Sequence, residues 1–553
     1  MKKKIIIGLL SAVFSSFCSS AFAQLLENKE TFTKADSLRG SLTSPFRTCY
    51  DINYYHLKVK VNPDERLING SNEFKFTATT NFKTLQFDLF DNLKIDKVIY
   101  QNQEIPFKRD FNAVFITFPE EILKGRRDSF TVFYSGKPTV AKNAPWDGGL
   151  VFTKHDGGKN WIATACQGVG ASIWWPNKDQ QEDEVDSALI SISVPNDLMD
   201  VSNGRLVAKT DLKDGYTRYD WKVVNPINNY DIAVNAANYA HFSDTYKGLN
   251  GNLSLDYYVL PENEVKAKTQ FTDVKRMLEA FEHWFGPYPF YQDGYKLVET
   301  PHLGMEHQSA VAYGNKYLKG YLGRDRSGTG WGLKWDFIIV HESGHEWFGN
   351  NITSKDIADM WIHESFTDYS ESLFLEYWYG KTAGADYVIG LRKNVQNDQP
   401  IIGPYGVNKE GSSDMYDKGA NLLHTVRTII NNDEKWRAIL TGLNKNFSKK
   451  TTTTTEVVNY INQQSGIDFT KVFNQYLNYK NIPTLEYKLE GKQFSYRWKT
   501  DVENFNMPVE LVVDSDNIKL KPTDSWQIIN LKTSTGQLKV KRDYYIDFKN
   551  VAD

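Results

Sequence analysis

Cysteine is scarce in this chain, which has only three among 553 residues and no pair at C-x-x-C spacing. A disulfide framework and a cysteine-rich metal site are therefore excluded as the basis of the fold. Two cysteines, Cys49 and Cys166, lie beyond the N-terminal segment. They could pair in an oxidising compartment or remain buried free thiols, and the sequence leaves both options open.

The chain also lacks an excess of either charge. Lysine and arginine number 65 against 68 aspartate and glutamate, the net charge is −3, and no long run of one sign occurs. This balance argues against a nucleic-acid partner. Beyond the N-terminus no segment is long and apolar enough to span a bilayer, so stable membrane insertion is not expected.

The N-terminus has the features of an export signal. Three lysines at positions 2–4 precede an apolar run over residues 5–14, and Ala21-Phe22-Ala23 has the small-x-small pattern that signal peptidase cleaves. The run is too short for an uncleaved anchor, and the residues before Cys18 do not resemble a lipoprotein signal. We interpret residues 1–23 as a cleaved signal peptide and expect a periplasmic or secreted protein.

Hydrophobic periodicity divides the rest of the chain. Residues 24–45 are polar and are expected to form a loosely held leader. Apolar and polar side chains then alternate from Tyr55 to Val61, and the turn sequence Asn62-Pro63-Asp64 ends this run. Similar short runs follow, which predicts an antiparallel β domain over residues 46–247.

A helical period replaces this alternation in the second half of the chain. Residues 271–285 carry one apolar face, and similar patterns predict a mainly helical domain over residues 248–481. Alternation returns in the last part, so residues 482–553 are expected to form a small β domain, and the fold class is multidomain α+β. The five threonines at positions 451–455 are expected to include a helix cap.

The sequence His341-Glu342-Ser343-Gly344-His345 contains the motif H-E-x-x-H after an apolar lead-in suited to a buried helix. Residues four apart share a helix face, so both imidazoles can bind one ion while Glu342 acts as the general base. Hydrolytic zinc sites commonly have a third protein ligand. Glu364 supplies it from a second predicted helix, with eighteen residues between it and His345. We predict one zinc ion per chain, and we interpret His363 as a structural or surface residue.

These motifs resemble the zinc-binding block of the gluzincin aminopeptidases, which include aminopeptidase N and the leukotriene hydrolases. The stretches HESGHEWFGNNIT and DMWIHESFTDYSE carry the resemblance, which extends over most of the chain. It implies a saddle-like N-terminal β domain, a thermolysin-like catalytic domain and a C-terminal β-sandwich. Many relatives continue into a large helical domain, which this chain is expected to lack.

A second motif, Gly304-Met305-Glu306-His307, resembles the family sequence G-x-M-E-N. The resemblance implies that Glu306 binds the α-amino group of the substrate, with Gly304 and Met305 beside it. A fixed carboxylate near the scissile bond favours a cationic amine and leaves only one residue before the metal. His307 stands where the family has asparagine and is expected to affect substrate positioning and the number of residues released.

Two more site residues follow from the same resemblance. Tyr416 lies in a segment similar to the family's Y-x-K-G block, which implies that its hydroxyl stabilises an oxyanion; a buried tyrosine at a helix start is the alternative. Gln167 corresponds to a glutamine of the family's substrate pocket. Trp174 and Trp175 could form a stacking platform for carbohydrate, but paired tryptophans are more often core residues.

The sequence therefore predicts a zinc-dependent aminopeptidase that acts on peptides. A thermolysin-like endopeptidase stays open, and only the Glu306 motif separates the two activities. An exopeptidase that releases dipeptides also stays open because of His307. A non-catalytic binding protein is disfavoured, since binding alone needs no base such as Glu342. The sequence predicts no oligomeric state.

Overall fold

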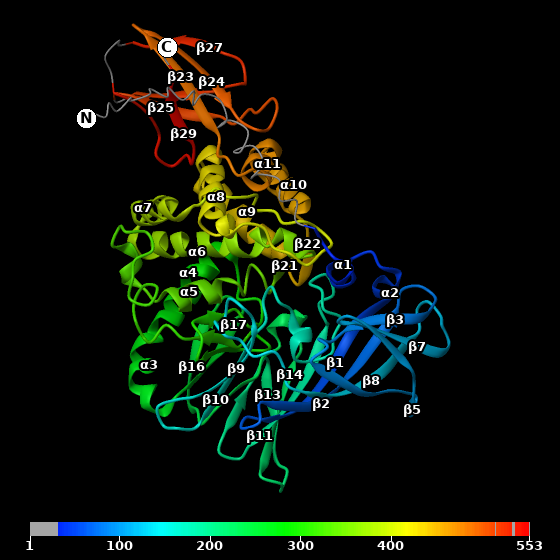
Figure 1. Ribbon diagram of the computed structural model, residues 1–553. Coiled ribbons are helices and arrows are strands. Elements are labelled where there is room, and N and C mark those ends of the chain that lie inside the picture. The colour runs from blue at the N-terminus through cyan, green and yellow to red at the C-terminus, as the bar shows by residue number, and fades with distance from the viewer. Residues whose placement is uncertain (1–30, 515, 533–536, 552–553) are drawn as a thin grey trace, which may run out of the picture.

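The computed structural model describes residues 31–514, 516–532 and 537–551. The predicted signal peptide lies outside the described residues. Figure 1 shows a β-rich N-terminal region in blue and cyan, a helical region in green and yellow, and a C-terminal β region in orange and red. This arrangement agrees with a multidomain α+β fold.

The described part of the polar leader differs from the loosely held segment that we expected. Residues Lys34–Gly40 form helix α1, which Thr33 and Asp36 begin with a reciprocal capping box. A short helix, α2 (Pro45–Thr48), follows. Arg47 of α2 is fully buried and pairs with Asp88 at 2.7 Å. A buried guanidinium needs such a partner, so this ion pair fixes the segment to the N-terminal region.

The N-terminal region is built on one large, mainly antiparallel sheet. The predicted alternation over Tyr55–Val61 is confirmed, because strand β1 buries every second side chain there. β1 pairs antiparallel with β2 across the predicted turn and parallel with β11. In sheet order the strands are β13 (Arg205–Asp211), β14 (Tyr216–Val223), β11 (Ser187–Pro195), β1 (Tyr50–Asn62), β2 (Leu67–Ala78), β8 (Arg127–Gly136), β4 (Leu93–Tyr100) and β5 (Gln103–Glu104).

Two smaller sheets complete this region. The first contains β12 (Met199–Val201), β15 (Asn235–Ala237), β10 (Asn160–Ala165) and β9 (Gly149–Lys154). The second contains β3 (Phe82–Asp88), β7 (Ala113–Ile122) and β6 (Phe107–Asp110). Gln167 follows β10 directly, so this strand delivers it to the boundary with the helical region.

Aromatic side chains dominate the N-terminal core. Phe74 stacks on Phe130 with ring centroids 4.5 Å apart. Trp174 and Trp175 are fully buried, which excludes the carbohydrate platform and confirms that they are core residues. Among the described residues both cysteines are free and buried, so the alternative of a disulfide is wrong.

The helical region starts with a mixed sheet on which the catalytic helices pack. Its strands, in order, are β16 (Ala240–Gly248), β17 (Gly251–Val259), β18 (Tyr295–Glu299), β20 (Val311–Tyr313) and β19 (Gly304–Met305). The predicted apolar helix before Gly286 is confirmed as α4. The helices are α3 (Glu264–Gln270), α4 (Thr272–Phe285), α5 (Phe337–Gly344), α6 (Trp361–Tyr379), α7 (Lys381–Leu391), α8 (Asp417–Ile430), α9 (Asp433–Asn446), α10 (Thr454–Ser465) and α11 (Thr470–Asn478). Figure 1 shows α4 and α5 beneath α6, and α8 above α6.

The threonine run includes a helix cap, as predicted. Thr453 caps α10 and forms a capping box with Glu456. Just before it, β22 (Lys450–Thr452) pairs parallel with β21 (Ile352–Ser354), which follows the H-E-x-x-H segment. This pairing ties the chain after α5 to the later helices.

After Pro483 the chain forms two further sheets. One contains β27 (Gln527–Asn530), β24 (Gln493–Lys499), β23 (Thr484–Glu490) and β29 (Asp547–Asn550). The other contains β26 (Asp516–Leu520), β25 (Val509–Val513) and β28 (Leu538–Val540). Buried side chains of both sheets, such as Phe494 and Leu511, belong to one hydrophobic cluster with the helices.

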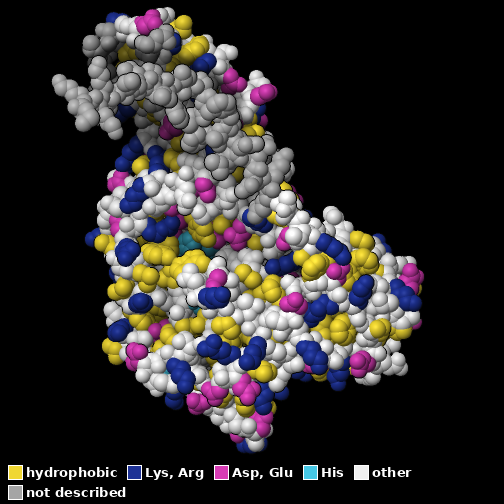
Figure 2. Space-filling model, viewed as in Figure 1, with side chains coloured by type: hydrophobic (Ala, Val, Ile, Leu, Met, Phe, Trp, Pro, Cys, Tyr) yellow, Lys and Arg dark blue, Asp and Glu magenta, His cyan; other side chains and the backbone are white. Residues whose placement is uncertain are grey.

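The surface carries no evident charge segregation on the face that Figure 2 shows, where lysine and arginine side chains are interspersed with aspartate and glutamate. No helix formed by the described residues is long and apolar enough to cross a membrane.

Candidate active site

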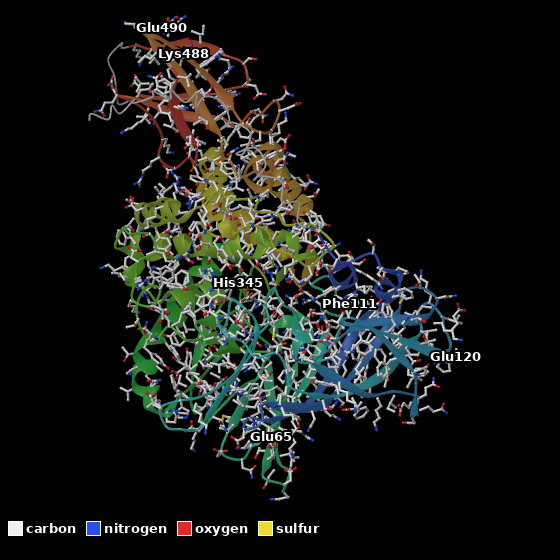
Figure 3. The ribbon with its side chains drawn as sticks, in the orientation of Figure 1. Glu65, Phe111, Glu120, His345, Lys488 and Glu490 are labelled. Atoms are coloured by element: carbon white, nitrogen blue, oxygen red, sulfur yellow. The ribbon has the colours of Figure 1, made fainter. Side chains whose placement is uncertain are left out.

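Helix α5 presents the two histidines of H-E-x-x-H on one face. Asp336 begins the helix, because its carboxylate accepts hydrogen bonds from the backbone N–H groups of Ile338 and Ile339. The helix ends at Gly344, yet His345 keeps a helical backbone conformation (φ −63°, ψ −20°). The imidazoles of His341 and His345 therefore lie on the same face, with ring centroids 5.2 Å apart. Figure 3 shows His345 in the interior, where the helices meet the strands beneath them.

Glu364 completes the predicted ligand set from the first turn of α6. Its Oε2 lies 3.4 Å from Nε2 of His345 and 3.8 Å from Nε2 of His341. One potential ligand atom from each residue lies within 4.8 Å of the other two, and all three residues are buried. The structure thus brings the three residues together as the sequence predicts.

The outer nitrogens of both histidines are already engaged. Nδ1 of His341 lies 2.7 Å from Oε1 of Glu371, and Nδ1 of His345 lies 3.0 Å from the carbonyl oxygen of Phe348. When each Nδ1–H donates a hydrogen bond to its oxygen, each Nε2 keeps a free lone pair that points at the common centre. Tyr387 in turn donates to Oε2 of Glu371 at 2.7 Å.

The donor set fits a zinc ion. Oε1 of Glu364 accepts a hydrogen bond from Nε2 of Gln167 at 3.0 Å, whereas the buried Oε2 has no hydrogen-bond partner among the described residues. A buried carboxylate oxygen without a partner is costly. Two imidazole nitrogens and one carboxylate oxygen beside an open cavity match the ligands of catalytic zinc.

The charges of the site also favour a cation. Burial raises the pKa of Glu342 well above its ordinary value, and the carboxylate of Glu306 adds to the effect. Burial lowers the pKa of His341 to about 3. For His345 the carboxylates of Glu364 and Glu306 outweigh burial and raise its pKa to about 10. A divalent cation at this centre would favour ionised carboxylates and neutral imidazoles, as ligation requires.

Strand β19 sets the position of Glu342. A Cβ atom on Gly304 would lie only 2.6 Å from Oε1 of Glu342, so the absence of a side chain at Gly304 allows this close approach. Glu306 follows the strand and is buried, and its Oε1 has no hydrogen-bond partner among the described residues. Asn350 holds the backbone here by donating to the carbonyl oxygen of Glu306 at 2.8 Å. Met305 lines the same cavity.

His307 does not reach this cavity. Its ring is fully buried, and neither ring nitrogen has a hydrogen-bond partner among the described residues. Burial lowers its pKa to about 3, so the ring is neutral. His307 does not line the cavity, so its expected effect on substrate positioning would be indirect and stays a prediction. The chain direction reverses there, because Ser309 has a positive φ of 58° and its N–H donates to Glu346 at 2.7 Å.

Tyr416 lies at the start of α8 and faces the metal-binding centre. Its ring stacks near that of His341, with centroids 6.1 Å apart. Burial, together with the carboxylates of Glu364 and Glu410, raises the pKa of Tyr416 well above its ordinary value. The phenol is therefore protonated and can donate a hydrogen bond into the cavity.

His363 lies on the far side of α6. Its Nε2 accepts a hydrogen bond from the backbone N–H of Ser354 at 2.9 Å. The ring is buried and does not line the cavity, which agrees with its interpretation as structural.

A cavity of about 340 Å³ lies between the N-terminal and helical regions. The N-terminal region contributes a loop around Trp146 and the residue Gln167, while the helical region contributes the rest. The lining residues are Pro145, Trp146, Gln167, Leu303, Gly304, Met305, Glu306, Tyr321, Arg326, Phe337, Ile338, His341, Glu342, His345, Glu364, Glu410 and Tyr416. The volume suits a few substrate residues rather than a folded protein.

Three residues near the cavity were missed by sequence reasoning. Glu371 lies seven residues after Glu364, or two helical turns, so the same helix spacing could have revealed it. Arg326 pairs with Asp368 at 3.0 Å and with Asp417 at 3.0 Å. Arg326 and Glu410 come from irregular segments, where no periodicity signals a contact.

Comparison with known families identifies both main parts of the chain. Residues 51–230 match the Peptidase M1 N-terminal domain, and residues 269–476 match the Peptidase family M1 domain. The zinc ligands, Glu342, Glu306 and Tyr416 all lie within the second match.

Among curated proteins, endoplasmic reticulum aminopeptidase 1 of Mus musculus is 24% identical over 263 residues, which cover 45% of this chain and 28% of the relative. Leucyl aminopeptidase of Saccharolobus solfataricus is 21% identical over 446 residues, which cover 76% of this chain and 54% of the relative. The chain thus spans between about a quarter and a half of the length of these relatives.

Among solved structures, an M1 zinc metallopeptidase from Deinococcus radiodurans superposes with a TM-score of 0.65 at 18% identity. The superposition covers 78% of this chain and 95% of the other. At this identity the likeness concerns the fold.

Proposed function

Because this chain belongs to peptidase family M1, we propose that it is a zinc-dependent aminopeptidase that hydrolyses the first peptide bond of peptides. The observation that carries the proposal is the buried, unpartnered Oε2 of Glu364, which faces Nε2 of both His341 and His345. Glu342 and Glu306 line the same cavity. The proposed metal ligands, the general base Glu342 and the residue that would bind the substrate amine, Glu306, therefore line one cavity.

His341, His345 and Glu364 would hold the zinc ion, which when bound acts as a Lewis acid and makes water more acidic. Glu342 takes the proton of the attacking water on its carboxylate and later delivers a proton to the leaving nitrogen. Its position against Gly304 keeps this carboxylate beside the strand along which a peptide would lie. The hydroxyl of Tyr416 donates a hydrogen bond to the oxyanion that develops on the substrate carbonyl.

Glu306 supports exopeptidase rather than endopeptidase activity. Its Oε1 lacks a donor among the described residues, and the ammonium group of a free N-terminus would supply one. An internal peptide segment has no cation at this point and would leave the buried carboxylate unpaired, at a cost of about 1–3 kcal/mol or more. The solved Deinococcus enzyme has also been crystallised with a Tyr-Ser-Ala substrate.

Hydrolysis of aminoacyl reporter amides with free N-termini, compared with their N-acetylated counterparts, tests this proposal. We expect cleavage of the free amides only, loss of activity with a chelator and recovery on adding zinc. Glu306→Gln should lower cleavage of every free amide. Cleavage of the acetylated set would instead indicate an endopeptidase, and release of dipeptides from longer peptides would indicate that the site around His307 admits two residues before the scissile bond.

Two further features belong to this proposal. We propose that the enzyme is exported, because residues 1–23 have the pattern of a signal peptide. N-terminal sequencing of the secreted or periplasmic protein should begin at Gln24. We also propose that the two C-terminal sheets pack as a β-sandwich, which a crystal structure of the enzyme would test.

A further inference from the structure

One carboxylate in the cavity has no part in the proposed chemistry. Glu410 lies in the irregular segment before Tyr416, is partly buried and lines the cavity. Within the described part of the chain, neither a hydrogen bond nor an ion pair involves its carboxylate. Burial, with Glu364 and Glu306, raises the pKa of Glu410 to about 7. The carboxyl group has no cation beside it among the described residues, and at pH 8 it is mainly ionised.

Glu410 lies against the segment that carries Gln167. A Cβ atom on Gly168 would be only 2.6 Å from Oε1 of Glu410, and Gly168 has a positive φ of 73°. Asn408, two residues before Glu410, donates to the carbonyl oxygen of Gly168 at 3.2 Å. Gln167 itself binds the zinc ligand Glu364. These contacts fix the Glu410 carboxylate at the Gln167 side of the cavity.

This side is where the first side chain of a peptide would lie. With its ammonium group on Glu306 and its carbonyl at the Glu364 centre, the α-carbon of the first residue sits between the two carboxylates. Glu410 lines the same cavity as both carboxylates and lies against Gly168, next to Gln167, which donates to Glu364 at 3.0 Å. Arg326, which also lines the cavity, is already paired with Asp368 and Asp417.

An aromatic ring lies beside the same segment. Trp146 lines the cavity although 64% of its surface is exposed. The loop that carries it packs on the segment after Gln167, because a Cβ atom on Gly148 would lie 2.5 Å from Cγ2 of Val169. A carboxylate together with an aromatic face is a combination that binds Lys and Arg side chains.

We propose that Glu410, assisted by Trp146, selects substrates whose N-terminal residue is lysine or arginine. The proposal rests on the aminopeptidase function proposed above. It makes Glu410 a specificity-determining residue, distinct from the amine anchor Glu306, which acts on every free N-terminus.

The test compares charged residues with neutral analogues of similar shape. Reporter amides of lysine and norleucine, and of arginine and citrulline, would be assayed at pH 8 with wild-type enzyme and with Glu410→Gln. We expect the wild type to prefer the charged member of each pair by about 10- to 100-fold in kcat/KM, as a charge-assisted contact provides. Glu410→Gln should lose this preference while norleucine and citrulline change less than about twofold.

Two variants separate this effect from others. Glu65→Gln, at an exposed turn of the N-terminal region far from the cavity, should leave both preferences intact (Figure 3). Glu306→Gln should lower all four substrates together. If Glu410→Gln also lowers all four equally, or if the wild type shows no preference, the proposal is wrong.

A binding measurement keeps the two proposals distinguishable. If the wild type cleaves none of the amides, the aminopeptidase function fails. Calorimetric titration with free L-arginine and L-citrulline would then decide the role of Glu410. Tighter binding of arginine by the wild type, lost in Glu410→Gln, supports a cationic subsite; equal binding of the two amino acids by the wild type overturns it.

Discussion

Replacing Glu371 with glutamine should weaken zinc binding although Glu371 is not itself a ligand. Its Oε1 accepts the hydrogen bond from Nδ1 of His341 at 2.7 Å, and both residues are buried. This bond fixes which nitrogen of His341 carries the proton and makes Nε2 a better donor to a metal. Glu371 thus acts on the metal through His341.

The structure sets the expected size of the effect. A glutamine could keep its oxygen toward His341, but its neutral amide would lose the charge that strengthens the bond. Its amide nitrogen would then face the hydroxyl of Tyr387, which now donates to Glu371 at 2.7 Å. Loss of such a partner lowers metal affinity by about 10- to 100-fold, or about 1.4–2.8 kcal/mol. We expect Glu371→Gln near the lower value and Glu371→Ala near the upper one.

Zinc affinity would be measured by competition with a chelating dye at fixed pH. Glu376→Gln is the matched control, since Glu376 lies on the same helix but pairs with Arg427 at 2.7 Å. This control should lose some stability without losing zinc affinity. If Glu371→Gln and Glu371→Ala both bound zinc within about twofold of the wild type, the hydrogen bond would have no role in metal affinity, and the reasoning would be refuted.

Three further changes, the last with a control substitution, have defined outcomes. Glu342→Gln should retain zinc but lose at least about 10²-fold in kcat, because the base is gone; a zinc-loaded variant with full turnover would contradict the mechanism. Tyr416→Phe should lower kcat by about 10²- to 10³-fold with little change in KM, measured on a free aminoacyl amide, since it removes one oxyanion donor. Phe74→Ala should cost about 3–5 kcal/mol of unfolding free energy in urea titrations, because Phe74 is fully buried. Phe111→Ala, which alters a ring that is 55% exposed, should change that free energy by less than about 0.5 kcal/mol.

Local patterns predicted the elements whose periodicity is strong. The alternation in β1, the apolar face of α4 and the cap of α10 all follow from residues within one or two turns of each other. Fixed spacing also predicted the metal ligands, because H-E-x-x-H places two imidazoles on one helix face whatever the rest of the chain does. Glu364 could also be predicted, because one further helix that returns toward the first is enough to bring it to the two histidines.

Contacts between distant segments could not be predicted in this way. Gln167 meets Glu364 across 197 positions of sequence, and only the packing of the N-terminal region on α6 brings them together. His307 illustrates the reverse case, because its sequence position suggested a substrate contact that the backbone path turns away from the cavity. The leader was expected to be loose because its polar composition does not reveal the partner of Arg39, which is Asp179 in the N-terminal region.

By itself, the sequence predicted the proposed zinc ligands, the proposed base and the order of β, helical and β regions, since each depends on local spacing. The tertiary structure alone decided the buried free thiols, the buried tryptophan pair, the contact of Glu371 with His341 and the position of Glu410 in the cavity. The physical reason is that burial and charge pairing depend on residues far apart in the chain, and their positions are fixed only when the regions pack together.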